Sequence, residues 1–299
     1  MTKYPTILPP HHPTDLNIVF LGTPRFAQII LRKLVSSQFK PQLVITGHDK
    51  KVGRGQTSEA TGVKLDAEKN HIEISSKLSS INNSFDIAIL AAFGQIIPKE
   101  ILTIPKYGFL NVHPSLLPKY RGPSPIRTPI LEGETKTGVT IIKLDKELDH
   151  GPILDQKEIT IDKLDTLMSL TEKLAKFGAD LLIETLPYYL SGKIKPKEQD
   201  HAQATYTKRL TKKDGYINLD NPSDPIKLDR LIRAFYPWPG VWSKLMVNGK
   251  WLIVKFLPDS PFLIQPEGKR PLTIRQFRNG YPNLYDLIKP ILEKNEKLI

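Results

Sequence analysis

The first half of the chain alternates between short, mostly apolar runs and longer segments with apolar residues at helical spacing. The short runs, which predict strands, lie at residues 16–24, 42–47, 86–94, 108–115 and 137–144, and the run at 86–94 is apolar on both faces. Strands that are apolar on both faces are typical of parallel sheets covered by helices. Residues 24–37 have helical spacing, with a proline where the first turn of a helix tolerates one. This alternation predicts an open α/β sheet.

The pattern changes after a long amphipathic segment. Residues 163–190 carry apolar side chains at i, i+3, i+4 and i+7, which predicts a long helix. Residues 191–205 are polar and contain Gly and Pro, so we expect a domain linker there. Residues 226–242 predict a helix ended by proline, and residues 241–256 predict two strands joined by an Asn-Gly turn. The second domain is therefore expected to be small and to contain β-strands.

The turn after the first apolar run argues against two common nucleotide-binding classes. It reads GTPRFA (22–27) and lacks the GxGxxG fingerprint of nicotinamide and flavin dehydrogenases. The chain also has no GxxxxGK[ST] motif, so a P-loop NTPase is not expected. Open α/β sheets bind ligands at the carboxyl ends of their strands. Residues 47–62 follow the second run, are rich in Gly, Lys and Arg, and predict a long exposed loop at that edge.

Composition limits the remaining possibilities. The 299 residues suffice for two domains, and no apolar run reaches the ~18 residues of a membrane span. The chain has no Cys, which excludes disulfides, thiolate zinc sites and a Cys nucleophile and is compatible with the cytoplasm, where we expect the protein. Its seven His residues lack metal-ligand spacing, so no metal is expected. Residues 1–15 lack the apolar run of a secretory signal and are expected to be flexible.

The positive charge is concentrated in the C-terminal third. The formal net charge is +12; residues 206–299 hold 17 Lys and Arg against 9 Asp and Glu, whereas residues 1–205 hold 26 against 22. A basic surface favours a polyanionic partner such as nucleic acid. On charge alone, a solvated Lys-rich surface that favours solubility explains the balance equally well.

The most informative stretch is NVHPSLLPKYRGPSPI (111–126). Asn111 and His113 alternate on a predicted strand, so their side chains share one face at its carboxyl end. Asn offers a donor that does not titrate, and His offers a donor that can carry a proton. Two converging donors can stabilise an oxyanion. Ser115 is the nearest nucleophile but is not in a GxSxG elbow, so direct transfer between two bound substrates is favoured over an acyl-enzyme.

A catalytic His usually needs a carboxylate beside it. The segment LDKELDHGPIL (144–154) offers Asp145, Glu147 and Asp149. The residues themselves do not choose among the three.

Together, the segments 111–126 and TGVTIIKLDKELDHGPIL (137–154) resemble the formyltransferase family that uses 10-formyltetrahydrofolate. The resemblance covers nearly the whole chain. It includes ATYTKRLTKKDGYINL (204–219) and LIRAFYPWPGVW (231–242), which resemble the C-terminal domain of members that formylate methionyl-tRNA. The C-terminal region is shorter than is usual in the family.

The resemblance implies functional residues. Asn111, His113 and Asp149 match the catalytic residues, with the Asp in the LDHG segment. The amine would attack the formyl carbon, Asn111 and protonated His113 would stabilise the oxyanion, and Asp149 would favour the charged imidazole. The tRNA-binding residues would be Lys51 and Arg54, in the inserted loop. The residues implied at the folate site are Phe93, Gly94, Gln95, Ser115, Leu116, Leu117 and Pro118.

It also implies the organisation of the chain. We expect a Rossmann-like catalytic domain with a mostly parallel sheet at 16–190, a linker at 191–205, and a small basic tRNA-binding domain of OB-type, β-barrel-like fold at 206–299. The expected partners are initiator methionyl-tRNA and the folate co-substrate, without a membrane or a metal, and the expected state is a monomer. One alternative is a sugar-nucleotide N-formyltransferase with the same folate donor. Another is a folate- or RNA-binding protein without catalysis.

Overall fold

The computed structural model describes residues 16–48, 50–52, 57–219, 224–247, 249–259, 262–286 and 288–289. The chain divides into two compact units. Unit 1 comprises Met1–Pro125, Lys136–Thr160 and Thr171–Thr207, and unit 2 comprises Ile126–Thr135, Ile161–Leu170 and Lys208–Ile299. The N-terminal extension expected at residues 1–15 and the tRNA-binding residue expected at Arg54 lie outside the described residues.

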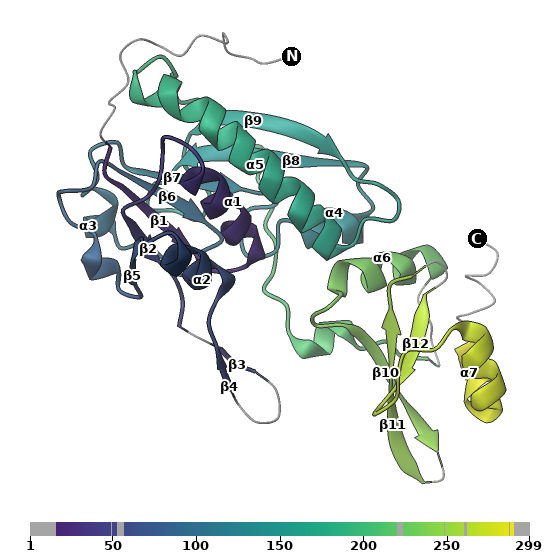
Figure 1. The fold of residues 1–299 in the computed structure, drawn as a ribbon. Coiled ribbons are helices and arrows are strands. Elements are labelled where there is room, and N and C mark those ends of the chain that lie inside the picture. Colours follow the sequence, from purple (N-terminus) through teal and green to yellow (C-terminus); the bar gives the residue numbers. More distant parts are fainter. Residues whose placement is uncertain are drawn as a thin grey trace. The chain divides into compact units, whose positions relative to one another are not determined.

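Unit 1 is built on a seven-stranded sheet with the order β5-β2-β1-β6-β7-β8-β9 (Figure 1). The strands are β1 (Ile18–Gly22), β2 (Leu43–Ile45), β5 (Glu73–Ser75), β6 (Ile87–Ala91), β7 (Phe109–His113), β8 (Lys136–Lys143) and β9 (Ile153–Thr160). The strands from β5 to β7 pair in parallel, whereas β8 and β9 join antiparallel. The predicted α/β fold with a mostly parallel sheet is confirmed. Its central strands β1, β6 and β7 are buried along their whole length, as expected for strands covered on both faces.

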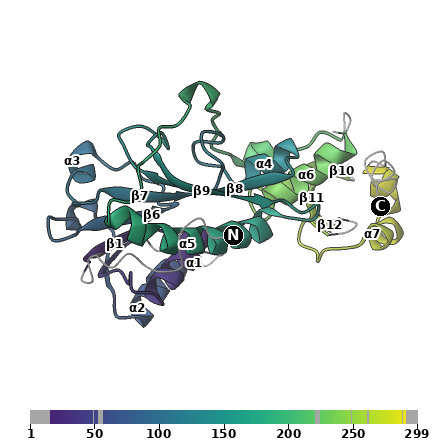
Figure 2. The same ribbon diagram turned by 90° about the horizontal axis from the view of Figure 1, so that it is seen from above.

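Two helices lie along one face of this sheet, α1 (Arg25–Val35) and α5 (Leu167–Leu190) (Figures 1 and 2). A Cβ added to Gly178 of α5 would lie 2.9 Å from Cγ1 of Val112 in β7. Glycine at this position therefore lets the helix backbone approach the strand that carries the candidate catalytic residues.

Smaller elements complete unit 1. They are the strands β3 (Lys50–Val52) and β4 (Thr57–Glu59), the helices α2 (Gly62–Lys69) and α3 (Lys99–Leu102), and the 3-10 turns η1 (Leu78–Ser80) and η2 (His201–Gln203). The strands β3 and β4 pair antiparallel within the segment expected as a loop. Backbone pairing defines this hairpin, and its polar sequence has no apolar alternation that would predict strands. Lys51 lies in β3.

The segment expected as a linker is packed into unit 1. Lys197 pairs with Ile153 at the start of β9, and Tyr206 pairs with Arg121. Gln199, between these two pairings, is buried. The segment therefore runs along the loop that follows β7.

Unit 2 contains a three-stranded antiparallel sheet and several short helices. Its elements are α4 (Arg127–Glu132), η3 (Lys212–Gly215), α6 (Pro225–Phe235), β10 (Val241–Val247), β11 (Lys250–Leu257), β12 (Leu263–Pro266) and α7 (Ile274–Gly280). The register Val247↔Lys250 places the β10–β11 turn where the Asn-Gly pair predicts it. In the described part of unit 2, β10 pairs with β11 and β11 with β12, so the sheet is open there. Among the described residues, no helix is both long and apolar enough to cross a membrane.

Candidate active site

Strand β7 carries both Asn111 and His113 into a buried position. Its pairing with β6 places Asn111 beside Leu90, and its pairing with β8 places His113 beside Thr140. The side chains of Asn111 and His113 are 5% and 4% exposed. Polar side chains so deeply buried need partners, and both find one in Asp149.

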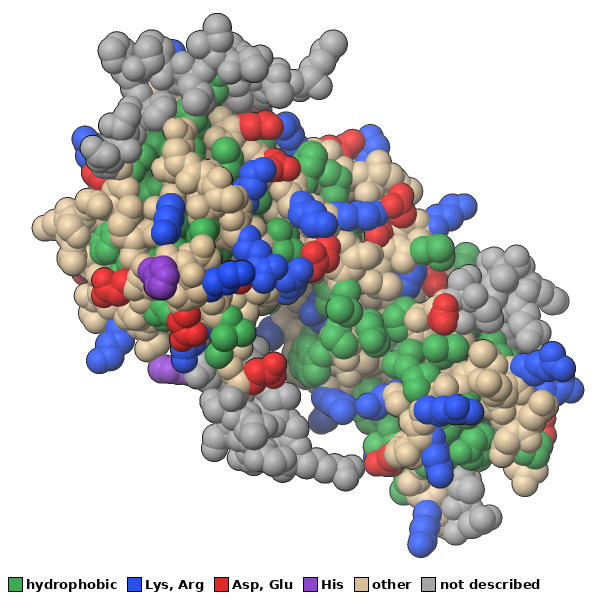
Figure 3. Space-filling view, in the orientation of Figure 1, with side chains coloured by type: hydrophobic (Ala, Val, Ile, Leu, Met, Phe, Trp, Pro, Cys, Tyr) green, Lys and Arg blue, Asp and Glu red, His purple; other side chains and the backbone are tan. Residues whose placement is uncertain are grey.

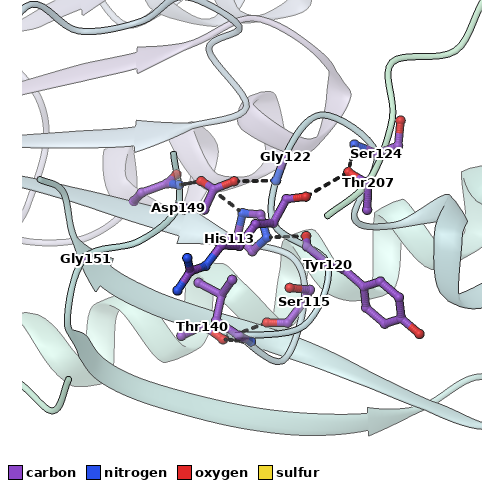
Figure 4. Close-up of polar contacts among 12 residues, drawn as sticks. His113, Ser115, Tyr120, Gly122, Ser124, Thr140, Asp149, Gly151 and Thr207 are labelled. Carbon is purple, nitrogen blue, oxygen red and sulfur yellow. Dashed lines mark hydrogen bonds and ion pairs between the residues drawn. The ribbon is translucent and has the colours of Figure 1, made fainter. Parts of the chain in front are cut away.

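Asp149 reaches these residues from the connection between β8 and β9. Its Oδ1 lies 3.3 Å from Nδ2 of Asn111 and 3.5 Å from Nδ1 of His113. Its Oδ2 accepts a 2.7 Å hydrogen bond from the backbone N–H of Gly122 (Figure 4). The structure thus brings together the three residues expected to be catalytic.

The other two candidate carboxylates face elsewhere. Oδ2 of Asp145 lies 2.6 Å from Nδ1 of His150, and Glu147 approaches Nε2 of the same ring at 3.8 Å. Asp149 is the carboxylate of this connection that faces His113.

Asn111 retains hydrogen-bonding capacity for a substrate. Its Nδ2 group donates one hydrogen to Asp149 and has a second one. Its Oδ1 is buried and has no hydrogen-bond partner among the described residues. A buried acceptor without a partner is unfavourable, and a bound molecule with an N–H or O–H donor would satisfy it.

His113 faces an acceptor on each side of its ring. Nε2 lies 3.1 Å from the carbonyl oxygen of Tyr120, which can only accept, so Nε2 carries a hydrogen (Figure 4). Nδ1 faces the Asp149 carboxylate. The ring therefore lies between a backbone carbonyl and a carboxylate.

The loop after β7 is held by Thr140 of β8. The Thr140 hydroxyl donates to the Ser115 carbonyl at 2.6 Å and accepts from the Leu117 N–H at 3.2 Å (Figure 4). The Ser115 hydroxyl donates to the Lys119 carbonyl at 2.6 Å and is buried. Ser115 therefore shapes the loop, and its hydroxyl does not point to Asp149 or His113.

The remaining residues expected at the folate site divide by exposure. Phe93, Ser115 and Leu117 are buried, Leu116 and Pro118 are half-buried, and Gly94 and Gln95 are exposed. The segment 93–95 follows β6, the strand paired with β7, so it begins close to Asn111 in the sheet. Ile96, the next residue, is 88% exposed. An aliphatic side chain so exposed is accessible to a ligand.

Three contacts of the site were not predicted. They come from the Tyr120 carbonyl, the Gly122 N–H and the Gln199 side chain, which donates to the Asp149 carbonyl at 2.9 Å. The first two are backbone groups, which every residue type offers. The one local signal is glycine at 122, where φ is +101°.

Two cavities of unit 1 lie away from this cluster. One of about 410 Å³ is lined by Thr46, His48, Lys64 and Ser75, among others, at the carboxyl ends of β2 and β5. It is open to solvent and shares no residue with the Asn111–His113–Asp149 cluster. The chemistry of the side chains, rather than cavity size, identifies the site.

No group of three or more His, Asp or Glu side chains in the described ranges could hold a metal ion.

Comparison with known proteins identifies the family. The family model described as formyl transferase matches residues 16–186. A methionyl-tRNA formyltransferase of Roseiflexus sp. is 36% identical, with 89% of this chain and 92% of the relative covered. A methionyl-tRNA formyltransferase of Thermodesulfovibrio yellowstonii is 40% identical, with 88% and 95% covered.

Solved structures share the fold at lower identity. An N-formyltransferase from Helicobacter canadensis, in complex with folinic acid and dTDP-3-aminofucose, superposes with a TM-score of 0.60 at 23% identity and covers 82% of this chain and 89% of its own. A 4-N formyltransferase from Francisella tularensis superposes with a TM-score of 0.64 at 17% identity and covers 83% and 99%. The family match and the long alignments at 36–40% identity together show that this chain belongs to the formyl transferase family, with methionyl-tRNA formyltransferases among its relatives.

Proposed function

We propose that this protein transfers the formyl group of 10-formyltetrahydrofolate to the amino group of initiator methionyl-tRNA. The observation that carries the catalytic part of the proposal is the buried cluster in which Asp149 faces both Asn111 and His113. The relatives with nearly full-length alignments carry the choice of acceptor.

Each residue of the cluster has a role in the transfer. Bound folate supplies the formyl carbon. The free N–H of Asn111 donates to the formyl oxygen as it gains negative charge, and His113 in its protonated form, whose N–H groups face Tyr120 and Asp149, stabilises that charge electrostatically. The unpartnered Oδ1 of Asn111 accepts an N–H from the attacking amine, which directs its lone pair at the carbon. The bond to N10 breaks, N10 gains a proton, and the amine loses one; Asp149 and His113 relay protons between the two nitrogens.

The exposed aliphatic side chain of Ile96 is proposed to pack against the folate. Ile96→Asp is expected to raise the KM for 10-formyltetrahydrofolate by about 10-fold or more, because it replaces an apolar contact surface by a charge. The KM for methionyl-tRNA should stay within about twofold. Steady-state kinetics with each substrate varied in turn measures both values. Leu164→Asp, at a side chain that is 73% exposed in unit 2, is the matched control. Equal effects of both substitutions would contradict the assignment.

The tRNA is proposed to bind through the inserted hairpin and unit 2. Figure 3 shows Lys and Arg side chains on the surface of unit 2, and residues 206–299 hold 17 of them against 9 Asp and Glu. On one face of the β10–β11 pair, the exposed side chains of Lys244, Lys255 and Trp251 provide charge and a stacking surface. These groups suit an anionic, aromatic polymer.

Arg54→Ala is expected to raise the KM for methionyl-tRNA about tenfold, the effect of one lost charge-assisted contact. The KM for folate should be unchanged. The comparison variant is Lys136→Ala, whose ammonium pairs with Glu158 at 2.7 Å on β9. A larger change in the KM for folate than in the KM for methionyl-tRNA would contradict the assignment of Arg54 to tRNA binding.

The function is tested by transfer of labelled formyl from 10-formyltetrahydrofolate to charged initiator methionyl-tRNA at two salt concentrations. Transfer that weakens steeply with salt is expected, because binding of a polyanion releases counterions. If the protein bound folate but transferred no formyl group, initiator methionyl-tRNA would be rejected as the acceptor. Transfer to a dTDP-amino sugar would then support sugar-nucleotide formylation, whose fold this chain shares.

Finer features of the protein remain predictions. They are the monomeric state, independence from metal, the cytoplasmic location and an OB-type barrel in the C-terminal domain. The open sheet of β10, β11 and β12 supplies three strands to such a barrel.

A further inference from the structure

A buried pair of side chains outside the catalytic cluster, Arg121 and Gln199, has no role in the reaction as described above. Arg121 is 2% exposed and Gln199 is 5% exposed. The guanidinium donates to Oε1 of Gln199 from Nε at 3.2 Å and from Nη2 at 2.7 Å. It also meets Nδ1 of His201 at 2.8 Å and the Tyr206 hydroxyl at 3.3 Å. An arginine is almost never buried so completely unless its donors are paired, as they are here.

The amide of Gln199 is used at both ends. Its Oε1 accepts from Arg121, and its Nε2 donates to the carbonyls of Asp149 at 2.9 Å and Gly151 at 2.8 Å. The guanidinium can only donate and the carbonyls can only accept, so the orientation of this amide is unambiguous. Gln199 thus ties the Asp149 turn to a buried cation in the loop after β7.

The turn that carries Asp149 needs such support. Asp149 has a φ of +50°, in the left-handed region, which Asp adopts more readily than most side chains with a Cβ but which stays less favourable than ordinary backbone. A Cβ on Gly151 would come within 1.9 Å of the Lys143 carbonyl, so the turn is pressed against the end of β8. The direction of the Asp149 carboxylate towards Asn111 and His113 follows from this backbone conformation.

We infer that Gln199, oriented by Arg121, is a positioning residue that sets the direction of the Asp149 carboxylate for formyl transfer. The inference rests on the proposed function. Gln199 acts through the backbone on either side of His150 and touches no reacting atom. A displacement of a catalytic group by about 1 Å is enough to lower a rate by about 10²-fold.

Gln199→Glu is the sharpest test. The new carboxylate still accepts from Arg121 but cannot donate to the carbonyls of Asp149 and Gly151. We expect kcat to fall about 10- to 100-fold, with the KM of both substrates within about twofold. Gln203→Glu makes the same change in the same segment, at an exposed amide that donates to Asp200, and should leave kcat within twofold. A kcat within twofold of the parent in Gln199→Glu would overturn the inference.

A double-mutant cycle separates positioning from a merely structural role. If Gln199 acts through Asp149, then Gln199→Glu should have little further effect on kcat in an Asp149→Asn background. Multiplying effects would show that Gln199 contributes independently and would overturn the inference. If Gln199→Glu does not fold, Arg121→Lys replaces it in the cycle. This substitution keeps the buried positive charge but loses the pair of hydrogen bonds that Nε and Nη2 donate to Oε1 of Gln199.

The outcomes distinguish this inference from the proposed function. Loss of the acceptor assignment would appear as no transfer by the parent protein. Failure of the inference alone would appear as normal transfer by the parent and by Gln199→Glu. If Asp149→Asn by itself left kcat unchanged, both the catalytic role of Asp149 and the inference about Gln199 would be wrong.

Discussion

Replacing Asp149 by Asn is expected to lower kcat for formyl transfer by about 10²- to 10⁴-fold, the range for acid and base groups. The carboxylate faces three donors, from Asn111, His113 and the Gly122 backbone. An amide has one oxygen and one NH₂ group, so at least one of these donors would face another donor. It would also remove the carboxylate whose Oδ1 lies 3.5 Å from Nδ1 of His113. Single-turnover transfer to methionyl-tRNA measures the effect.

Folate binding should survive in Asp149→Asn, because the cluster acts on the reacting atoms. The matched control is Asp145→Asn in the same connection, whose carboxylate meets His150 rather than His113. That variant should retain kcat within a few-fold. If the two substitutions lowered kcat equally, the connection as a whole rather than Asp149 would be responsible, and the assignment would be wrong.

The second large effect is expected at His113. In His113→Gln, the amide can still donate to the Tyr120 carbonyl, so the loop should keep its shape. The amide cannot carry a proton, and both stabilisation of the formyl oxygen and proton relay are lost. We expect kcat to fall about 10²-fold or more, with little change in the thermal unfolding midpoint. The measurement pairs transfer kinetics with thermal denaturation.

The exposed His71, which has no contact with the cluster, offers the control variant His71→Asn. Asn tolerates the positive φ of 54° at this position. Turnover close to that of the parent is expected. Near-normal turnover in His113→Gln would falsify the catalytic role of the imidazole, whatever the result at Asp149.

The strands of the sheet could be predicted because buried positions are occupied mostly by apolar residues, and this pattern is visible in the sequence. Strands β1 and β6 carry no polar side chain, since helices or loops cover both faces. The same pattern does not reveal direction. Strand β8 is also mostly buried, yet it runs antiparallel to β7, with Lys143 beside Leu110. Direction depends on the path of the connecting chain, which no local pattern encodes.

Polar segments were harder to read. The hairpin of β3 and β4 and the packed stretch around Gln199 are polar, and both were expected to be irregular. Their structure comes from backbone pairing and from hydrogen bonds to distant partners. Such interactions leave no periodicity, because a polar side chain can serve solvent and a buried partner equally well.

The candidate site divides in the same way. Alternation on one strand was enough to place Asn111 and His113 together. The choice of Asp149 over Asp145 and Glu147 came from family resemblance, and the structure shows which carboxylate faces His113. The orientation of that carboxylate depends on the Gly122 N–H and on Gln199, which lie 27 and 50 residues from Asp149 in the sequence.

By itself, the sequence determined what burial and residue chemistry dictate: an α/β sheet, a basic C-terminal region, and an Asn-His pair whose chemistry suits acyl transfer. Only the tertiary structure decided how the β8–β9 connection folds back, which carboxylate meets the imidazole, and that a buried arginine and glutamine brace it. The physical reason is that hydrophobic periodicity is a local property of the chain. Hydrogen-bond partners far apart in sequence are chosen by the whole fold.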